Sequence, residues 1–87
     1  MVTVHVSCGI PAGLHARPAA EFTALAQQFQ SDVYLRNVSV SGEFCNAKRP
    51  TQLLAADVWQ NQLVELEVDG PDEEECARVL KQYLIGR

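Results

Sequence analysis

The 87-residue chain has a composition that excludes several classes of protein before any motif is considered. Hydrophobic residues make up 47% and charged residues 21%, which is typical of a globular domain and argues against disorder. Seven Lys and Arg against eleven Asp and Glu give a net charge of −4, so the surplus of positive charge that non-specific nucleic-acid binding needs is missing. No apolar run approaches the roughly 18 residues that span a bilayer, and the N-terminal residues have no signal-peptide pattern. We therefore expect one domain over residues 1–87, with no nucleic acid, no membrane insertion and a cytoplasmic location.

The cysteines and histidines do not form a disulfide or metal pattern. Cys8, Cys45 and Cys76 are odd in number and far apart, and none belongs to a CxxC pair. His5 and His15 lie in different segments, so no zinc spacing is present. We expect no metal and no cofactor, and we interpret the thiols as reduced, small apolar side chains.

The first elements in chain order are a strand and a helix. Residues 2–7 alternate valine with polar residues, a period of two that predicts a strand with one buried face. After a loop rich in Gly and Pro, a helix is expected from His15, with Pro18 in its first turn. Its apolar stripe follows helical spacing and comprises Phe22, Leu25, Ala26 and Phe29.

The middle of the chain predicts two further strands. Residues 32–41 have apolar residues of both parities, so we expect a strand with a bulge around Arg36 and Asn37 that puts them all on one face. Ser41 and Gly42 predict a tight turn, followed by a short strand over residues 43–46.

The second half predicts a short helix, a strand and a long helix. The short helix opens near Arg49 and Pro50, and residues 64–68 alternate to give a strand with one wet face. The last helix begins at residues 70–71 with four acidic residues in its first turn, which suits the helix dipole, while Lys81 and Arg87 lie toward its end and Gly86 follows its last apolar residue. Its inner stripe is Cys76, Ala77, Leu80, Tyr83 and Leu84. The order β-α-β-β-α-β-α predicts an α+β fold, an open-faced two-layer sandwich of a four-stranded antiparallel sheet with three helices on one face.

The stretch from Gly13 to Ala19 contains the strongest candidates for functional residues. His15 stands where a loop meets a helix, and Arg17 follows two residues later. The first N–H groups of a helix have no internal partner and attract anions, and the Arg guanidinium has a forked donor face that suits phosphate. A neutral imidazole there is a nucleophile, so a phosphoryl group on His15 would meet those donors. The alternative at this stage is a helix-capping histidine beside a surface arginine.

Three segments resemble the HPr family, the histidine-containing phosphocarriers of the bacterial phosphoenolpyruvate:sugar phosphotransferase system. The string Gly-Leu-His-Ala-Arg-Pro-Ala-Ala at residues 13–20 is similar to that family's active-site signature. Asn46-Ala47-Lys48 resembles the start of its second motif, and residues 69–73 resemble the entry to its last helix. The resemblance covers essentially the whole chain.

The resemblance implies a phosphoryl carrier, not a turnover enzyme. By this likeness His15 is the acceptor and is phosphorylated on Nδ1 by enzyme I, which phosphoenolpyruvate has charged, and the group then passes to an enzyme IIA domain of a sugar transporter. Arg17 matches the arginine that assists the phosphate, and the backbone amides of Ala16 and Arg17 match the helix-start donors. The local basic patch would be Arg17, Lys48 and Arg49, and we expect a monomer with no cofactor.

The chain departs from the family pattern where partners dock. Many members carry a regulatory serine directly after Asn-Ala-Lys, whereas Arg49 stands there and cannot accept phosphate, so we expect no regulatory serine. The expected docking residues are Lys48, Arg49, Pro50, Thr51, Leu53 and Leu54. Because the usual bulky apolar residues are replaced at 50 and 51, a specialised paralogue is one reading. An alternative is an HPr-fold regulatory module that binds proteins through the surface from Lys48 to Leu54.

Other positions are expected to be structural or to reflect small changes of the motif. The segment between His15 and Asn46 is about three residues longer than is usual in the family, and we place the extra residues near Arg36 and Asn37. The asparagine common before Gly-Leu-His is Ala12. We interpret His5 as a solvent-facing sheet residue, Cys8 as an inert apolar residue at the end of the first strand, and Trp59 as a cap on the core.

Overall fold

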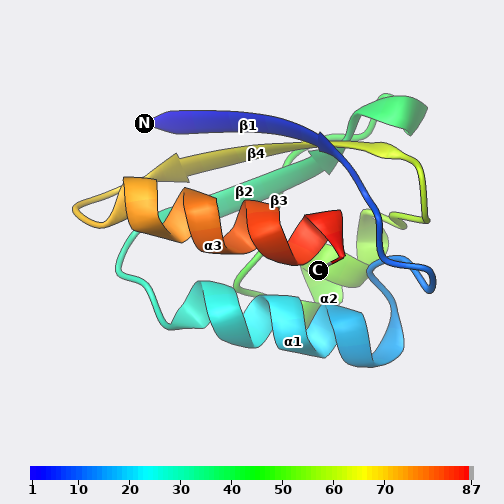
Figure 1. Ribbon diagram of the computed structural model, residues 1–87, viewed down its shortest axis with the longest axis horizontal. Coiled ribbons are helices and arrows are strands. Elements are labelled where there is room, and N and C mark those ends of the chain that lie inside the picture. The colour runs from blue at the N-terminus through cyan, green and yellow to red at the C-terminus, as the bar shows by residue number, and fades with distance from the viewer. Residues whose placement is uncertain (87) are drawn as a thin grey trace.

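The computed structural model describes residues 1–86 as a four-stranded antiparallel sheet with helices packed on one face (Figure 1). The strand order is β1-β4-β2-β3. The elements are β1 (Val2–Ser7), α1 (Ala16–Gln27), β2 (Asp32–Asn37), a 3₁₀ helix η1 (Val38–Val40), β3 (Cys45–Asn46), α2 (Pro50–Ala55), β4 (Leu63–Asp69) and α3 (Glu73–Ile85). The predicted fold class and element order are confirmed.

The sheet buries one face because its strands alternate as the sequence predicts. In β4, which lies between β1 and β2, Val64, Leu66 and Val68 have no exposed area. None of α1, α2 and α3 covers the opposite face of the sheet (Figure 1), which carries His5, exposed as predicted. Glu65 departs from the expected wet face: it is only 9% exposed.

The burial of Glu65 has a clear cause in its neighbours across the strands. Its carboxylate accepts a hydrogen bond from Arg36 Nε at 2.6 Å and lies 3.2 Å from His5 Nε2. Arg36 and His5 stand opposite Glu65 on the two adjacent strands, so both cover it. A charge can be buried on an open sheet face when opposite charges and donors surround it.

The second strand is shorter than predicted, and the bulge expected at Arg36 and Asn37 is wrong. The chain leaves the sheet after Asn37 and forms the 3₁₀ helix η1. The Asn37 side chain accepts a hydrogen bond from Ser39 N and so caps this turn. Val40 is therefore 59% exposed and does not join the core. The third strand is also shorter than predicted.

Helices α1 and α3 lie side by side over the sheet and run in opposite directions (Figure 1). Four of the five predicted inner residues of α3 are buried, and Tyr83 packs against the core at its edge. Of the stripe predicted for α1, Phe22 and Ala26 are buried, whereas Leu25 and Phe29, which lies just beyond the end of the helix, are partly buried. Gly86 ends α3 in the left-handed conformation, as its position predicted. Arg87, expected near the end of this helix, lies outside the described residues.

None of the helices in residues 1–86 is long and apolar enough to cross a membrane.

The start of α1 lies beside the segment that joins α2 to β4, at the right-hand end of the molecule in Figure 1. Leu14 N donates to Val58 O at 2.9 Å, which ties the two segments together. Gly13 has φ +72°, and a Cβ there would lie 2.4 Å from Val58 O and 2.9 Å from Trp59 Cα. Only glycine permits this approach, so Gly13 brings the segment of residues 57–59 against His15.

Candidate functional site

His15 is the N-cap of α1, and its ring is not used to cap the helix. Its backbone is extended, with φ −132° and ψ 159°, and its side chain makes no capping hydrogen bond. The N–H groups of Ala16 and Arg17 have no acceptor among residues 1–86, and Pro18 has no N–H. The first turn contains no acidic residue. The helix start therefore keeps free donors and its positive dipole end beside the ring.

The residue directly after His15 has an unusual backbone conformation. Ala16 has φ +51°, although it begins a helix. The left-handed region costs a non-glycine residue about 1–2 kcal/mol, so the surrounding contacts hold the chain there. The bond from Leu14 to Val58 and the close approach of Gly13 supply such contacts on the N-terminal side. The sharp change of direction lets the chain enter α1 immediately after the His15 side chain.

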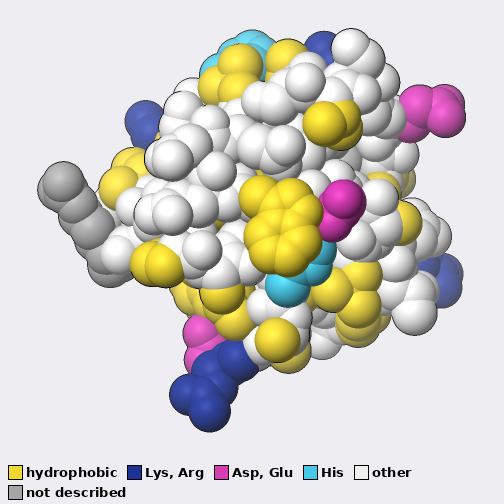
Figure 2. Space-filling view, turned by 90° about the vertical axis from the view of Figure 1, so that its right-hand side faces the viewer, with side chains coloured by type: hydrophobic (Ala, Val, Ile, Leu, Met, Phe, Trp, Pro, Cys, Tyr) yellow, Lys and Arg dark blue, Asp and Glu magenta, His cyan; other side chains and the backbone are white. Residues whose placement is uncertain are grey.

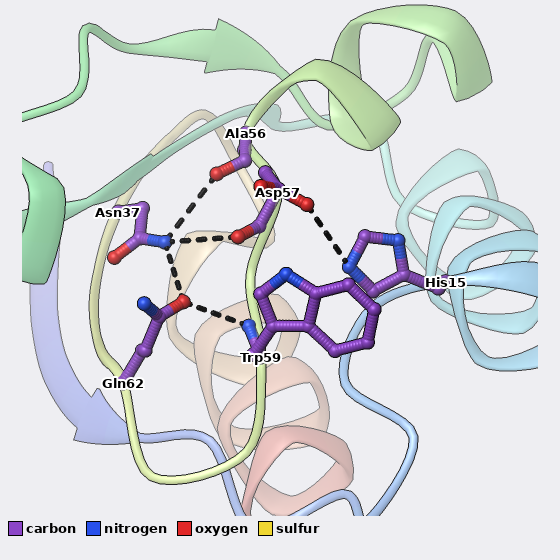
Figure 3. A network of polar contacts seen from close by, with 6 residues as sticks. All are labelled: His15, Asn37, Ala56, Asp57, Trp59 and Gln62. Carbon is purple, nitrogen blue, oxygen red and sulfur yellow. Dashed lines mark hydrogen bonds and ion pairs between the residues drawn. The ribbon is translucent and has the colours of Figure 1, made fainter.

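Two side chains from the segment between α2 and β4 contact the His15 ring (Figure 3). The indole of Trp59 stacks on the imidazole with ring centroids 3.9 Å apart and planes 29° from parallel. Asp57 Oδ1 lies 3.4 Å from His15 Nε2, which is within ion-pair distance but is not a hydrogen bond in its geometry. Nε2 is buried, and no other group in residues 1–86 bonds to it. Nδ1 lies on the side of the ring away from Asp57 (Figure 3), and the His15 side chain is 23% exposed.

A polar network behind the ring holds these two residues in place (Figure 3). The Asn37 side chain, which is 1% exposed, donates to the carbonyls of Ala56 and Asp57 at 3.4 and 3.2 Å and to Gln62 Oε1 at 2.9 Å. Gln62 Oε1 also accepts from Trp59 N at 2.8 Å. A buried and satisfied network of this kind gives the segment one defined conformation, so Asp57 and Trp59 are presented to His15 by a rigid support.

The sequence reasoning missed both contacts. Trp59 was expected to cap the core, and that is wrong: it is 49% exposed, and its indole covers His15. Asp57 was not singled out. No local pattern indicates either residue, because they meet His15 across more than 40 positions of chain through a close backbone approach at Gly13.

The expected docking residues fall into different environments. Leu53 is fully buried in the core and lines no surface, so its expected place among the docking residues is wrong. Leu54, on the same helix, is 44% exposed, and Arg49, Pro50 and Thr51 are exposed as well. Arg49 is the N-cap of α2 and makes no side-chain capping bond.

The expected basic patch does not assemble as one unit. Lys48 Nζ donates to Phe29 O at 2.7 Å, just beyond the C-terminal end of α1, whereas Arg17 lies in the first turn of that helix. A helix of 12 residues is about 18 Å long, so the two cations are at opposite ends. Figure 2 shows the face at this end of the molecule: a histidine ring lies near its centre against a large hydrophobic side chain and an acidic one, with basic side chains toward the rim.

Tyr83 joins the end of α3 to the first turns of α1. Its hydroxyl donates to Glu21 Oε1 at 2.7 Å and lies 3.3 Å from Pro18 O. Burial, with a further contribution from the Glu21 carboxylate, raises the pKa of Tyr83 to about 12. This phenol therefore remains protonated at neutral pH and acts as a donor that fixes the helix start.

The cysteines are free thiols, and two of them are buried, as expected of small apolar residues. Cys8 and Cys76 have no exposed area, and Cys45 is half-buried. Burial raises the pKa of Cys76 to about 11 and also raises that of Cys45. These two thiols are therefore protonated at neutral pH and are poor nucleophiles.

The structure is thus a small open-faced α+β sandwich with a partly exposed histidine at the free start of its first helix. Residues 2–85 match the family model described as "PTS HPr component phosphorylation site". The chain belongs to the HPr family of the phosphotransferase system.

Two relatives support the family at the level of the whole domain. The chain is 34% identical to the phosphocarrier protein HPr of Mycoplasma pneumoniae over 84 residues, which cover 97% of this chain and 93% of that protein. It is also 34% identical to the multiphosphoryl transfer protein of Shigella flexneri over 87 residues, but it spans only about a tenth of that protein's length.

Solved structures agree with the fold. HPr of Thermoanaerobacter tengcongensis has a TM-score of 0.89 at 32% identity, covering 97% of this chain and 91% of that one. Crh of Bacillus subtilis, a catabolite repression protein described as a swapped dimer, has a TM-score of 0.74 at 37% identity, covering 97% and 93%.

Proposed function

We propose that this chain is a phosphocarrier of the phosphotransferase system, in which His15 accepts a phosphoryl group on Nδ1 from enzyme I and passes it to an enzyme IIA domain. The observation that carries the proposal is the His15 ring at the start of α1, next to backbone amides of Ala16 and Arg17 that have no acceptor within residues 1–86. Membership of the HPr family supports the same role.

The chemistry of the site suits a transient phosphoryl group. The lone pair of Nδ1 attacks phosphorus, the bond from phosphorus to the donor atom breaks, and its electron pair stays with the donor. The phosphate oxygens then lie near the Ala16 and Arg17 amides and the Arg17 guanidinium, which stabilise their charge. The site is open to solvent on one side, so a second protein can reach the phosphorus and take the group onward.

The test is phosphorylation by enzyme I with phosphoenolpyruvate, followed by mass spectrometry. We expect a gain of one phosphate that is stable in base and labile in acid, and its complete loss in His15→Ala. His5→Ala is the matched control, because it removes the other histidine, 56% exposed on the open sheet face, and should leave the gain intact. No gain in the wild-type protein would overturn the proposal, and so would a gain that His5→Ala abolishes.

A second candidate function is that of a regulatory module that binds proteins through the surface from Lys48 to Leu54. The similarity to Crh favours it, as does the exposure of Leu54 on α2. This function would give partner binding that His15→Ala leaves unchanged and that Leu54→Asp abolishes. Binding that depends on phosphorylated His15 would exclude it in favour of the carrier.

We further propose that the carrier works as a monomer and is not regulated at position 49, where Arg replaces a phosphorylatable serine. Light scattering after size-exclusion chromatography tests the first point, since a swapped dimer would have twice the mass of 9.6 kDa. Incubation with a serine kinase active on HPr proteins tests the second, with no serine phosphate expected at this position.

A further inference from the structure

We propose that Asp57 is a positioning residue whose carboxylate keeps the proton of the neutral His15 ring on Nε2, which leaves the lone pair of Nδ1 free to accept a phosphoryl group. The inference rests on the proposed carrier function for its purpose, but the ring tautomer that it assigns is a property of the unmodified protein.

The first argument is the position of the carboxylate. Asp57 Oδ1 lies 3.4 Å from Nε2, and Nε2 is buried with no hydrogen-bond partner in residues 1–86. A neutral imidazole carries its single proton on one nitrogen and a lone pair on the other. A lone pair on Nε2 would face the negative carboxylate without water between them, which is repulsive, whereas an N–H there is attracted to it. The carboxylate therefore favours the proton on Nε2.

The second argument is that the ring cannot turn away from this arrangement. Trp59 stacks on the imidazole, with 3.9 Å between the ring centroids, and blocks that face of the ring. The backbone of residues 57–59 is held by the Asn37 and Gln62 side chains, so the carboxylate and the indole stay in register with the ring (Figure 3). Asp57 itself has φ +52°, a conformation that Asp adopts more readily than most residues.

The proton on Nε2 also serves the chemistry of transfer. When Nδ1 bonds to phosphorus and the donor bond breaks, no proton moves, and the ring becomes a cation with its Nε2–H directed at the Asp57 carboxylate. The face of Trp59 attracts a cation as well. When the phosphoryl group is passed on, the bond from Nδ1 to phosphorus breaks and the ring leaves as neutral imidazole, a better leaving group than its anion. One proton placement thus favours both acceptance and release.

The test is the tautomer of His15, measured by long-range ¹H–¹⁵N correlation spectroscopy of the unphosphorylated protein at a pH where the ring is neutral. We expect the wild type to be overwhelmingly Nε2–H. In Asp57→Gly the ratio of Nδ1–H to Nε2–H should rise about fivefold, a modest factor because the carboxylate is 67% exposed and water screens it. Glycine is chosen because it accepts φ +52° without strain.

Three further variants make the result specific to the Asp57 carboxylate. Asp57→Asn keeps the shape with a neutral acceptor and should give an intermediate ratio. Asp32→Asn removes an exposed carboxylate from β2 and should change nothing. Trp59→Leu keeps a bulky side chain over that face of the ring and leaves the Asp57 carboxylate in place, so it should shift the tautomer ratio much less than Asp57→Gly does.

The proposal is overturned if the wild type is mainly Nδ1–H, if Asp57→Gly leaves the ratio unchanged, or if Trp59→Leu shifts it as much as Asp57→Gly does. With enzyme I and phosphoenolpyruvate, Asp57→Gly should also accept phosphate about twofold to fivefold more slowly, the worth of a solvent-exposed ion pair. A wild type that is Nε2–H but is never phosphorylated would overturn the carrier function and leave the tautomer assignment standing, so the two claims fail separately.

Discussion

The N-termini of the two long helices, α1 and α3, both carry the positive end of a helix dipole, but the charges that surround them are opposite in kind. The helices are of nearly equal length, 12 and 13 residues, so their dipoles are comparable. The first turn of α3 contains Glu73, Glu74 and Glu75, whereas that of α1 contains no acidic residue. One helix start is supplied with negative charge by its own sequence, and the other is left without it.

The acidic groups at the start of α3 are also engaged in structure. Asp72 accepts hydrogen bonds from Gln30 N and Ser31 N, each at 2.9 Å, and from Ser31 Oγ at 2.5 Å. Glu73 accepts from Gly70 N at 3.1 Å and lies 3.0 Å from the amino group of Met1. These bonds lower the pKa values of both carboxyls, with the Ser31 hydroxyl as the largest cause for Asp72 and the Gly70 amide for Glu73. The acidic residues at the start of α3 are therefore engaged in contacts within the protein and need no ligand.

The start of α1 instead pairs free amides with a histidine and an arginine. A helix N-terminus that the chain fills itself contributes to stability, and one that it leaves unfilled is available to an external anion. The comparison therefore separates a structural end of this small domain from the end that we propose to be functional, and substitutions at the two ends should affect different measurements.

The largest expected effect comes from giving α1 the charge that α3 has. Arg17→Glu removes a charge-assisted donor to phosphate and adds a repelling carboxylate, so we expect roughly a hundredfold slower phosphorylation of His15 by enzyme I. The same change suits the helix dipole and should stabilise the fold by about 0.3–0.5 kcal/mol. Rapid-quench phosphorylation and urea unfolding measure the two effects.

For Arg17→Glu we thus expect opposite effects in the two measurements, a lower rate of phosphorylation and a higher free energy of unfolding. Lys81→Glu, which makes the same charge change at an exposed site on α3, serves as the control and should leave the rate unchanged. Equal slowing in both variants would mean that overall charge, not the start of α1, governs the reaction.

A smaller effect is expected from separating the two segments that form the site. Gly13→Ala places a methyl group 2.4 Å from Val58 O at φ +72°, so it should cost about 2 kcal/mol of unfolding free energy. It should also move the His15 ring out of its stack on Trp59, which changes the ring-current shifts of the imidazole protons in NMR spectra. Gly42→Ala is the control, because the nearest atom to its Cβ is 3.3 Å away and its φ is not positive. An unshifted imidazole in Gly13→Ala would show that the stack does not depend on this approach.

The smallest of the three effects is expected at the start of α3. It should change the stability of the fold and leave the phosphorylation of His15 unchanged. Asp72→Ala removes the acceptor of three hydrogen bonds and should lower the free energy of unfolding at neutral pH. Because the pKa of Asp72 is lowered in the folded state, its contribution is present above the unfolded pKa and is lost as the pH falls through the folded one. The difference in the free energy of urea unfolding between the variant and the wild type should thus become smaller below about pH 4. Altered phosphorylation of His15 in this variant would contradict the division of the molecule into two ends.

The elements that could be predicted from the sequence are those specified by local patterns. The alternation in residues 2–7 and 64–68 and the stripe of α3 are periodic over enough residues to define which face is buried. The end of β2 could not be predicted in this way. The η1 turn depends on Asn37, whose side chain reaches Ala56, Asp57 and Gln62, and such distant polar bonds leave no trace in the neighbouring residues.

In the candidate site, likewise, the residues within a local motif could be predicted, and those brought in from distant segments could not. The position of His15 at a helix start follows from the order of loop, Pro18 and apolar stripe, and the family motif names Arg17 as its companion. The contribution of Asp57 and Trp59 was hidden, because it arises where two loops touch. The burial of Leu53 beside the exposed Leu54 was equally hidden, since a helix of six residues has too few turns to define its buried face from sequence.

The stack of Trp59 on His15 gives the protein an intrinsic optical probe. Trp59 is the sole tryptophan of the chain, so all indole emission originates beside the imidazole. An imidazole that gains positive charge accepts electron density from an excited indole and thereby quenches the fluorescence of that indole. The proposed phosphorylation and dephosphorylation of His15 can therefore be followed by tryptophan fluorescence in real time, with no label attached and no radioactive donor.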